Sequence, residues 1–93
     1  MSRETSTILT NLCLIEDTST NKVVLQYRSP ERYKKWSGYA FPGGHIEEGE
    51  GLVESVIREV YEETGLTIAD PKLVAVKDWE PDEGGRYIVF CYK

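Results

Sequence analysis

The chain has 93 residues, with 16 acidic and 11 basic side chains and a formal net charge of −5 at pH 7. This length predicts one small domain over residues 1–93. The acidic balance argues against binding to a nucleic-acid backbone, because affinity for that polyanion comes chiefly from Lys and Arg. The sequence has no apolar run of membrane-spanning length and no signal-peptide core, so we expect a cytoplasmic protein that does not bind membranes.

Two strands joined by a turn are predicted at the start of the chain. Thr7–Ile15 is rich in β-branched and aliphatic residues, which favours a strand. Asp17–Asn21 is a cluster of turn residues, and Lys22–Tyr27 is predicted to be the hairpin partner of the first strand. Arg28 follows this second strand directly and is either a surface charge or a ligand for a phosphate, which a planar guanidinium suits.

A basic loop and a group of aromatic residues come next. The loop spans Ser29–Ser37 and holds the most basic patch of the chain, which either steers a polyphosphate toward a binding site or is simply an exposed loop. Trp36, Tyr39 and Phe41 are candidates to stack on a nucleobase, although aromatic residues at the start of a strand more often belong to a core. Tyr39–Phe41 is itself predicted to be a short strand.

A glycine turn and an amphipathic helix are predicted in the middle of the chain. The turn is at Gly43 and Gly44, and the helix is expected to begin after Gly51 and to end at Gly65 in a left-handed conformation. Aliphatic residues recur there at the three-and-four spacing that gathers them on one side of a helix, which we expect to face a core. They are Val53, Val56, Ile57 and Val60.

The same helix carries three carboxylates on a neighbouring face, those of Glu59, Glu62 and Glu63. Like charges at this spacing oppose helix formation by roughly 0.2–0.5 kcal/mol per pair, so we expect a bound cation to offset the repulsion. Mg²⁺ and Mn²⁺ prefer oxygen ligands, and the backbone freedom of Gly44 would let its carbonyl turn toward such an ion. The alternative is a helix face that is merely solvated.

The last third of the chain predicts a second hairpin. Lys72–Trp79 and Arg86–Tyr92 are expected to be strands, and Pro81–Gly85 is expected to be the turn that joins them. Leu66–Ile68 is predicted to be a brief extended segment before this hairpin.

The cysteines and the single histidine are assigned structural roles. Cys13 and Cys91 lie in apolar segments without a CxxC partner, so we expect both to be buried free thiols. His45 is a conceivable general base, but it has no positioned partner in the sequence, which favours a structural or exposed role.

The segment from Gly44 to Leu66 resembles the signature of the Nudix hydrolases, G-x5-E-x7-R-E-U-x-E-E-x-G-U, in which U is a bulky aliphatic residue. The matching residues are Gly44, Glu50, Arg58, Glu59, Val60, Glu62, Glu63, Gly65 and Leu66. This resemblance implies an α/β (α+β) fold in which a mixed β-sheet packs against the helix of the motif. Relatives continue with a further strand and a second helix, so the resemblance also implies that the chain is truncated at its C-terminus.

The resemblance also implies roles for individual residues. The expected ligands of Mg²⁺ or Mn²⁺ are Gly44, Glu59, Glu62 and Glu63. Glu59 is the expected catalytic base, and Glu63 is the alternative. Glu50 is expected to pair with Arg58, which would orient the acidic face and keep the arginine away from the substrate.

The activity implied by the resemblance is metal-dependent hydrolysis of a pyrophosphate bond in a nucleoside diphosphate linked to another moiety. Arg28 is expected to bind phosphate, and Tyr39 and Phe41 to bind the base of a small nucleotide. The motif's neighbourhood is similar to the branch that hydrolyses oxidised purine nucleotides such as 8-oxo-dGTP to a monophosphate and pyrophosphate. The alternative is a Nudix-like module that binds nucleotide or metal with weak or no turnover. A homodimer is a further expectation, since many relatives pair through their sheets.

Overall fold

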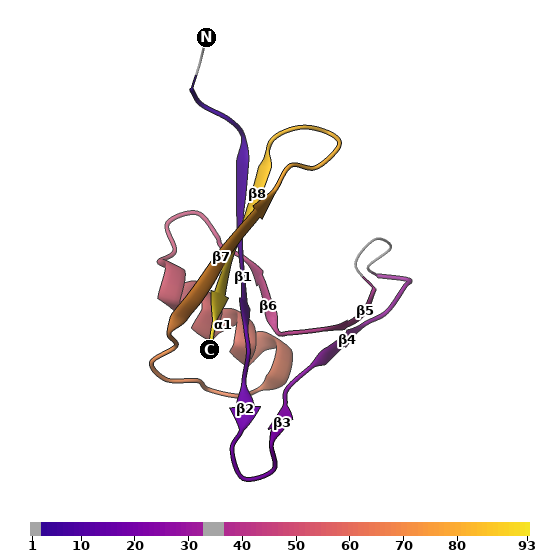
Figure 1. Cartoon of the computed structure of the whole chain (residues 1–93), viewed down its shortest axis with the longest axis vertical. Coiled ribbons are helices and arrows are strands. Elements are labelled where there is room, and N and C mark those ends of the chain that lie inside the picture. Colours follow the sequence, from indigo (N-terminus) through magenta and orange to yellow (C-terminus); the bar gives the residue numbers. More distant parts are fainter. Residues whose placement is uncertain (1–2, 33–36) are drawn as a thin grey trace.

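The computed structural model describes residues 3–32 and 37–93 (Figure 1). Lys34 and Lys35 of the basic loop and the aromatic candidate Trp36 lie outside the described residues. What the sequence predicts for these three residues therefore stays a prediction.

A four-stranded mixed sheet forms the centre of the molecule, in the order β6-β1-β8-β7 (Figure 1). Strands β1 (Thr7–Cys13) and β8 (Arg86–Tyr92) run parallel to each other. Strand β6 (Gly43–His45) is antiparallel to β1, and β7 (Leu73–Trp79) is antiparallel to β8. The predicted mixed sheet and the predicted hairpin in the last third of the chain are both confirmed.

The first predicted hairpin is present, but its boundaries were wrong. Strand β1 ends at Cys13, and the hairpin itself is formed by the short strands β2 (Glu16–Asp17) and β3 (Lys22–Val23). The predicted strand Lys22–Tyr27 is interrupted after Val23. The interruption has a physical reason, because the residues before and after it pair with different partners.

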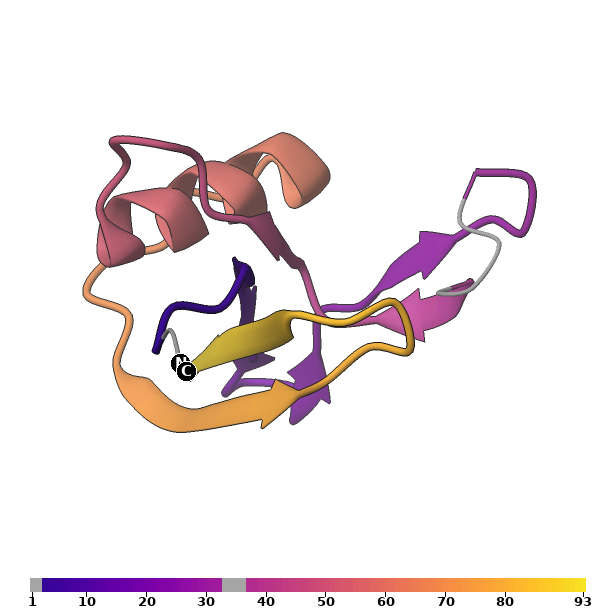
Figure 2. The same ribbon diagram turned by 90° about the horizontal axis from the view of Figure 1, so that it is seen from above.

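The second half of that predicted strand belongs to an arm that projects from the sheet (Figures 1 and 2). Strand β4 (Gln26–Arg28) pairs antiparallel with β5 (Gly38–Ala40), and Tyr27 lies opposite Tyr39 in this pair. The predicted strand Tyr39–Phe41 is therefore shifted by one residue. This arm places Arg28 at the end of β4, as expected for the residue that closes this strand.

The predicted glycine turn is a strand instead. Gly43 and Gly44 belong to β6 and pair with Leu12 and Asn11 of β1. A Cβ atom on Gly43 would collide with the backbone carbonyl oxygen of Asn11, so glycine allows β6 to approach β1 this closely. The two glycines therefore reflect close packing of two backbones and not a turn.

Helix α1 (Leu52–Thr64) begins and ends where the sequence predicts. Gly51 is its N-cap, and the Glu54 carboxylate accepts a hydrogen bond from the Gly51 backbone N–H at 3.4 Å. Gly65 ends the helix with φ at 77°, and its N–H donates to the Tyr61 carbonyl at 2.8 Å. Figure 2 shows the helix lying along one side of the sheet.

The core lies between this helix and the sheet, and it is small. Its buried members are Cys13, Val56, Val60 and Tyr92. Ile57 is only half-buried and Val53 is 47% exposed, so the prediction that Val53 faces the core was wrong. Val53 lies in the first turn of α1, whereas the core is formed under later turns.

Both cysteines are free thiols, but only one is fully buried. Cys13 is 2% exposed, and Cys91 is half-buried, so the expectation of burial was wrong for Cys91.

Several aliphatic side chains of β7 are exposed, namely those of Leu73, Val74 and Val76. No helix within residues 3–32 and 37–93 has the length and apolar composition needed to cross a membrane.

Candidate active site

A cavity of about 560 Å³ lies between helix α1 and the strands, and its lining includes two groups of residues. The group that we call the carboxylate wall consists of Gly44, Glu59 and Glu63. The group that we call the hairpin wall consists of Trp79, Tyr87 and Val89 of β7 and β8. Arg28 and Phe41 also line the cavity, so the fold brings them to the same place as the helix carboxylates.

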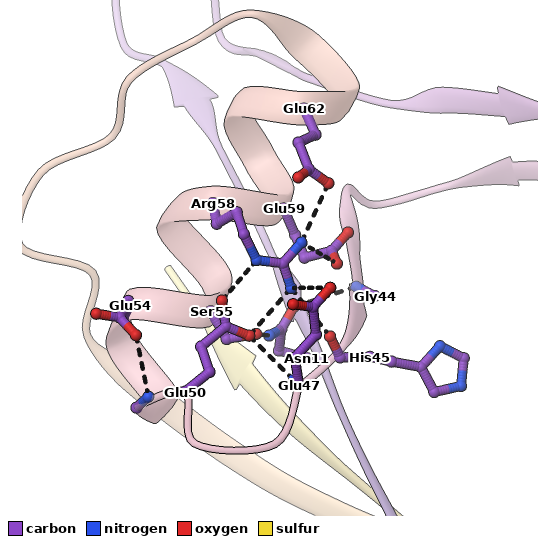
Figure 3. Close-up of polar contacts among 11 residues, drawn as sticks. Asn11, Gly44, His45, Glu47, Glu50, Glu54, Ser55, Arg58, Glu59 and Glu62 are labelled. Atoms are coloured by element: carbon purple, nitrogen blue, oxygen red, sulfur yellow. Dashed lines mark hydrogen bonds and ion pairs between the residues drawn. The ribbon is translucent and has the colours of Figure 1, made fainter.

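Arg58 contacts several carboxylates beside the carboxylate wall (Figure 3). Its guanidinium forms a bidentate contact with the Glu50 carboxylate. Nε donates to one carboxylate oxygen, and Nη2 donates to the other at 3.0 Å. Its Nη1 lies 2.9 Å from the Glu59 carboxylate and 3.1 Å from that of Glu62. The structure therefore places Glu50 and Arg58 in contact, in the arrangement that the resemblance implies.

The Glu50 carboxylate holds Arg58 in place, and the Glu50 side chain is only 9% exposed. Hydrogen bonding to Arg58 is the main reason that the pKa of Glu50 falls to about 2, and the Glu47 backbone amide and the Ser55 hydroxyl add smaller effects. The contact with Glu50 is also the main reason that the pKa of Arg58 is raised. Both groups therefore stay charged at neutral pH and hold each other in place.

The carboxylates of Glu59 and Glu63 lie next to each other at the cavity. Burial is the main reason that the pKa of Glu63 is raised, and the negative charge of Glu59 raises it further. A hydrogen bond from the Gly43 backbone N–H, at 3.2 Å, acts in the opposite direction, as does the positive charge of Arg28. Arg28 is therefore near enough to act on the charge of the carboxylate wall.

The backbone of Gly44 lies against the Glu59 carboxylate. A Cβ atom added at Gly44 would collide with the Glu59 side chain, so this close approach requires glycine. The backbone and two adjoining carboxylates form an oxygen-rich group, which is the chemistry that Mg²⁺ and Mn²⁺ prefer. The donor set therefore fits a hard divalent cation.

Two of the sequence-predicted site residues lie elsewhere. Glu62 does not line the cavity, and its side chain is 56% exposed and bound to Arg58. Within the described part of the chain, no three acidic, histidine or cysteine side chains form a metal-binding cluster.

Tyr39 is 76% exposed on the β4–β5 arm and contacts the Tyr27 ring edge-on, with 5.3 Å between the ring centroids. His45 lines the cavity, but Figure 3 shows its ring pointing away from the carboxylates.

Several residues of the site were not predicted from the sequence. Trp79 and Tyr87 are opposite each other on β7 and β8, and their rings are stacked nearly parallel with centroids 5.0 Å apart. Asn11 and Ser55 are both buried and join β1, β6 and α1 by hydrogen bonds. The signal in the sequence was weak, because only an amide within an apolar strand distinguished Asn11.

Comparison with known proteins agrees with this geometry. The family model for the NUDIX domain matches residues 8–93. The chain is 44% identical over 57 residues to the Nudix hydrolase YvcI of Bacillus subtilis (strain 168), covering 61% of this chain and 34% of that protein. It is 39% identical over 66 residues to the ADP-ribose pyrophosphatase of Methanocaldococcus jannaschii, covering 71% of this chain and 37% of that protein. The chain thus spans about a third of the length of these relatives.

Among solved structures, the crystal structure of the MutT protein from Methanosarcina mazei Go1 superposes with a TM-score of 0.79 and is 28% identical. That match covers 98% of this chain and 64% of the solved chain. Three findings agree with one another: the residues of the sequence motif, the mixed sheet with its helix, and the match of the family model over most of the chain. The chain belongs to the Nudix family.

Proposed function

We propose that this chain hydrolyses the pyrophosphate bond of a nucleoside diphosphate linked to another moiety, using Mg²⁺ or Mn²⁺. The observation that carries the proposal is the meeting of Glu59 and Glu63 beside the Gly44 backbone at a cavity. When bound, the cation supplies positive charge against the diphosphate and makes the attacking water more acidic. Glu59, Glu63 and the Gly44 carbonyl would hold it, with Glu62 as the third carboxylate that the family resemblance implies.

The chain's own residues have separate tasks in this proposal. Glu59 takes the proton of the attacking water, and Glu63 is the alternative base. Glu50 retains Arg58, which keeps that guanidinium on the helix rather than on the substrate. Arg28 reaches the cavity from β4 and binds a substrate phosphate, for which its planar guanidinium is suited.

The remaining part of the cavity suits the base of a nucleotide. Phe41, Trp79 and Tyr87 line it, and flat aromatic rings stack on nucleobases. Tyr39 is left out of this role because it lies on the exposed arm. A small-molecule nucleotide fits a cavity of about 560 Å³, and an oxidised purine nucleoside triphosphate such as 8-oxo-dGTP is the first candidate. Its products would be a monophosphate and pyrophosphate. A cytoplasmic location and a homodimer belong to the same proposal.

The competing function is a module that binds nucleotide without turnover. The observation in its favour is that Glu62 is bound to Arg58 and lies outside the cavity lining. A third metal-binding carboxylate would have to leave that contact.

A substrate panel separates the two functions. The protein is incubated with Mg²⁺ and 8-oxo-dGTP, other nucleoside triphosphates, nucleotide sugars or dinucleoside polyphosphates, and the phosphate products are counted. We expect turnover that EDTA abolishes and that Glu59→Gln lowers by roughly 10²–10⁴-fold. The exposed Glu48 provides the matched control, because Glu48→Gln makes the same chemical change outside the cavity lining. Nucleotide binding with no turnover of any substrate would instead establish the module.

A further inference from the structure

A buried chain of hydrogen bonds links the Gly44 backbone to the interior of helix α1 (Figure 3). The Gly44 N–H donates to Oδ1 of Asn11 at 3.1 Å, and Nδ2 of Asn11 donates to the Ser55 hydroxyl at 2.9 Å. Asn11 is 4% exposed and Ser55 is fully buried. The Ser55 hydroxyl also makes a small contribution to the lowered pKa of the Glu50 carboxylate, which holds Arg58. These hydrogen bonds thus connect β6 through β1 to helix α1.

The directions of these bonds follow from the chemistry of each group. A backbone N–H can only donate, so the amide oxygen of Asn11 must face Gly44 and its amide nitrogen must face Ser55. The hydroxyl of Ser55 accepts that bond with its oxygen and still has its own proton to donate. Each group therefore has one orientation, and the buried amide has a partner on both sides.

The position of the Gly44 backbone is weakly restrained by its own residue type. Glycine is the residue whose backbone is least restricted, and β6 is a strand of three residues that pairs with β1. On its other side Gly44 meets the Glu59 carboxylate, which comes from helix α1. The distance between the Gly44 backbone and Glu59 therefore depends on how β6 is held against α1.

We propose that Asn11, held in turn by Ser55, is a positioning residue that fixes the Gly44 peptide beside the Glu59 carboxylate. The catalytic part of this inference rests on the proposed function, because it assumes that this group of oxygens holds a divalent cation. Groups that orient the residues around a metal typically change metal affinity or activity by about 10–100-fold when they are removed. A role in stability alone would leave those properties unchanged.

Ser55→Ala tests the inference with the smallest change. It removes the acceptor for Asn11 and keeps a good helix former, so the fold is expected to persist. In the metal-free protein, we expect hydrogen exchange at the Gly44 amide, measured by NMR, to become about fivefold faster. We expect Mn²⁺ to bind about tenfold more weakly and kcat to fall about tenfold with KM little changed.

Two further variants make the result specific. Thr64→Val is the matched control, because Thr64 is on the same helix and its hydroxyl bonds to the Val60 carbonyl of its own helix at 2.7 Å. It should leave Gly44 exchange and Mn²⁺ affinity at wild-type values. Asn11→Ala removes both bonds of the amide, and adding Ser55→Ala to it should cause no further loss if Ser55 acts through Asn11. If Asn11→Ala does not fold, Ser55→Ala alone decides.

The outcomes separate this inference from the proposed function. Unchanged Gly44 exchange and Mn²⁺ affinity in Ser55→Ala overturn the inference, as does an equal response to Thr64→Val. A wild-type protein that binds Mn²⁺ but hydrolyses nothing overturns only the proposed hydrolysis, because exchange and metal affinity still decide the positioning role. A wild-type protein that does not bind Mn²⁺ overturns the proposed function and the catalytic part of the inference, and Gly44 exchange in the metal-free protein then decides the positioning role.

Discussion

The carboxylate wall comes from one continuous stretch of the chain, whereas the hairpin wall is assembled from two strands that the sheet brings together. Gly44, Glu59 and Glu63 are held by charged and backbone hydrogen bonds that converge on Arg58, Asn11 and the glycine backbone. Trp79 and Tyr87 are held by stacking on each other across the hairpin. Under the proposed function, chemistry and base recognition can therefore be changed separately, which mutations on each wall can test.

Among the variants that test this comparison, the largest effect is expected from Gly44→Ala on the carboxylate wall. The added methyl group would displace the Glu59 carboxylate, and a misplacement of about 1 Å can cost about 100-fold in rate. We expect kcat to fall by about that factor in steady-state assays with Mg²⁺.

Gly51→Ala is the control for this change. Gly51 precedes the helix, its φ of −72° suits alanine, and the nearest atom to an added methyl group would be 3.9 Å away. Because Ala is a poorer N-cap than Gly, a small loss of stability with unchanged kcat is expected. Equal rates for Gly44→Ala and the wild type would contradict the described contact with Glu59.

A smaller effect is expected from Trp79→Ala on the hairpin wall. Stacking of a base on an aromatic side chain is worth about 1–3 kcal/mol, so KM for a nucleoside triphosphate should rise about tenfold. Hydrolysis of inorganic tripolyphosphate, which has no base, should not change. Val74→Ala on the exposed part of the same strand is the control variant. A loss of kcat that is equal for both substrates would show that the two walls are not separable.

Glu50→Gln tests how the carboxylate wall is anchored. The pKa of Glu50 is lowered from about 4.5 to about 2 in the folded protein, so its charge stabilises the fold above the ordinary pKa. This contribution is lost as the pH falls from about 4.5 toward about 2. Urea unfolding should therefore show a variant less stable than wild type near neutral pH, with the difference shrinking in acid. A difference that does not vary with pH would argue against the Arg58 contact as its source.

The smallest effect is a difference in reactivity between the two thiols. One lies on β1 beneath the helix, and the other lies on the hairpin strand β8. Burial raises the pKa of Cys13, which is 2% exposed, so its reactive thiolate is scarce and shielded. Cys91 is half-buried. Titration with a thiol reagent should show Cys91 reacting first, and Cys91→Ser should remove the fast phase. A fast phase that persists in this variant would contradict the described burial of Cys13.

The difference between the two walls also explains how much the sequence could predict. Residues of the carboxylate wall have fixed spacings along one helix and its preceding segment, so the sequence alone indicated Gly44, Glu59 and Glu63. The pair of Glu50 and Arg58 was expected from the resemblance to the Nudix motif. The helix boundaries were predicted correctly because glycines mark both ends.

The residues that the sequence did not indicate are brought together by strand pairing. Trp79 and Tyr87 meet because β7 and β8 have a particular register, and Asn11 meets Gly44 because β6 lies beside β1. Neither register is visible in spacing along the chain. Glu62 has the spacing of a ligand, but it also stands four residues after Arg58, and this helical spacing makes the two side chains neighbours.

A crystal soaked with Mn²⁺ is the most direct test of the central claim, that the carboxylate wall is a divalent-cation site. The anomalous signal of manganese identifies the ion without reference to turnover. We predict a peak within about 2–2.5 Å of carboxylate oxygens of Glu59 and Glu63 and close to the Gly44 carbonyl. Manganese that is absent from this wall, or bound only elsewhere on the molecule, would contradict the account.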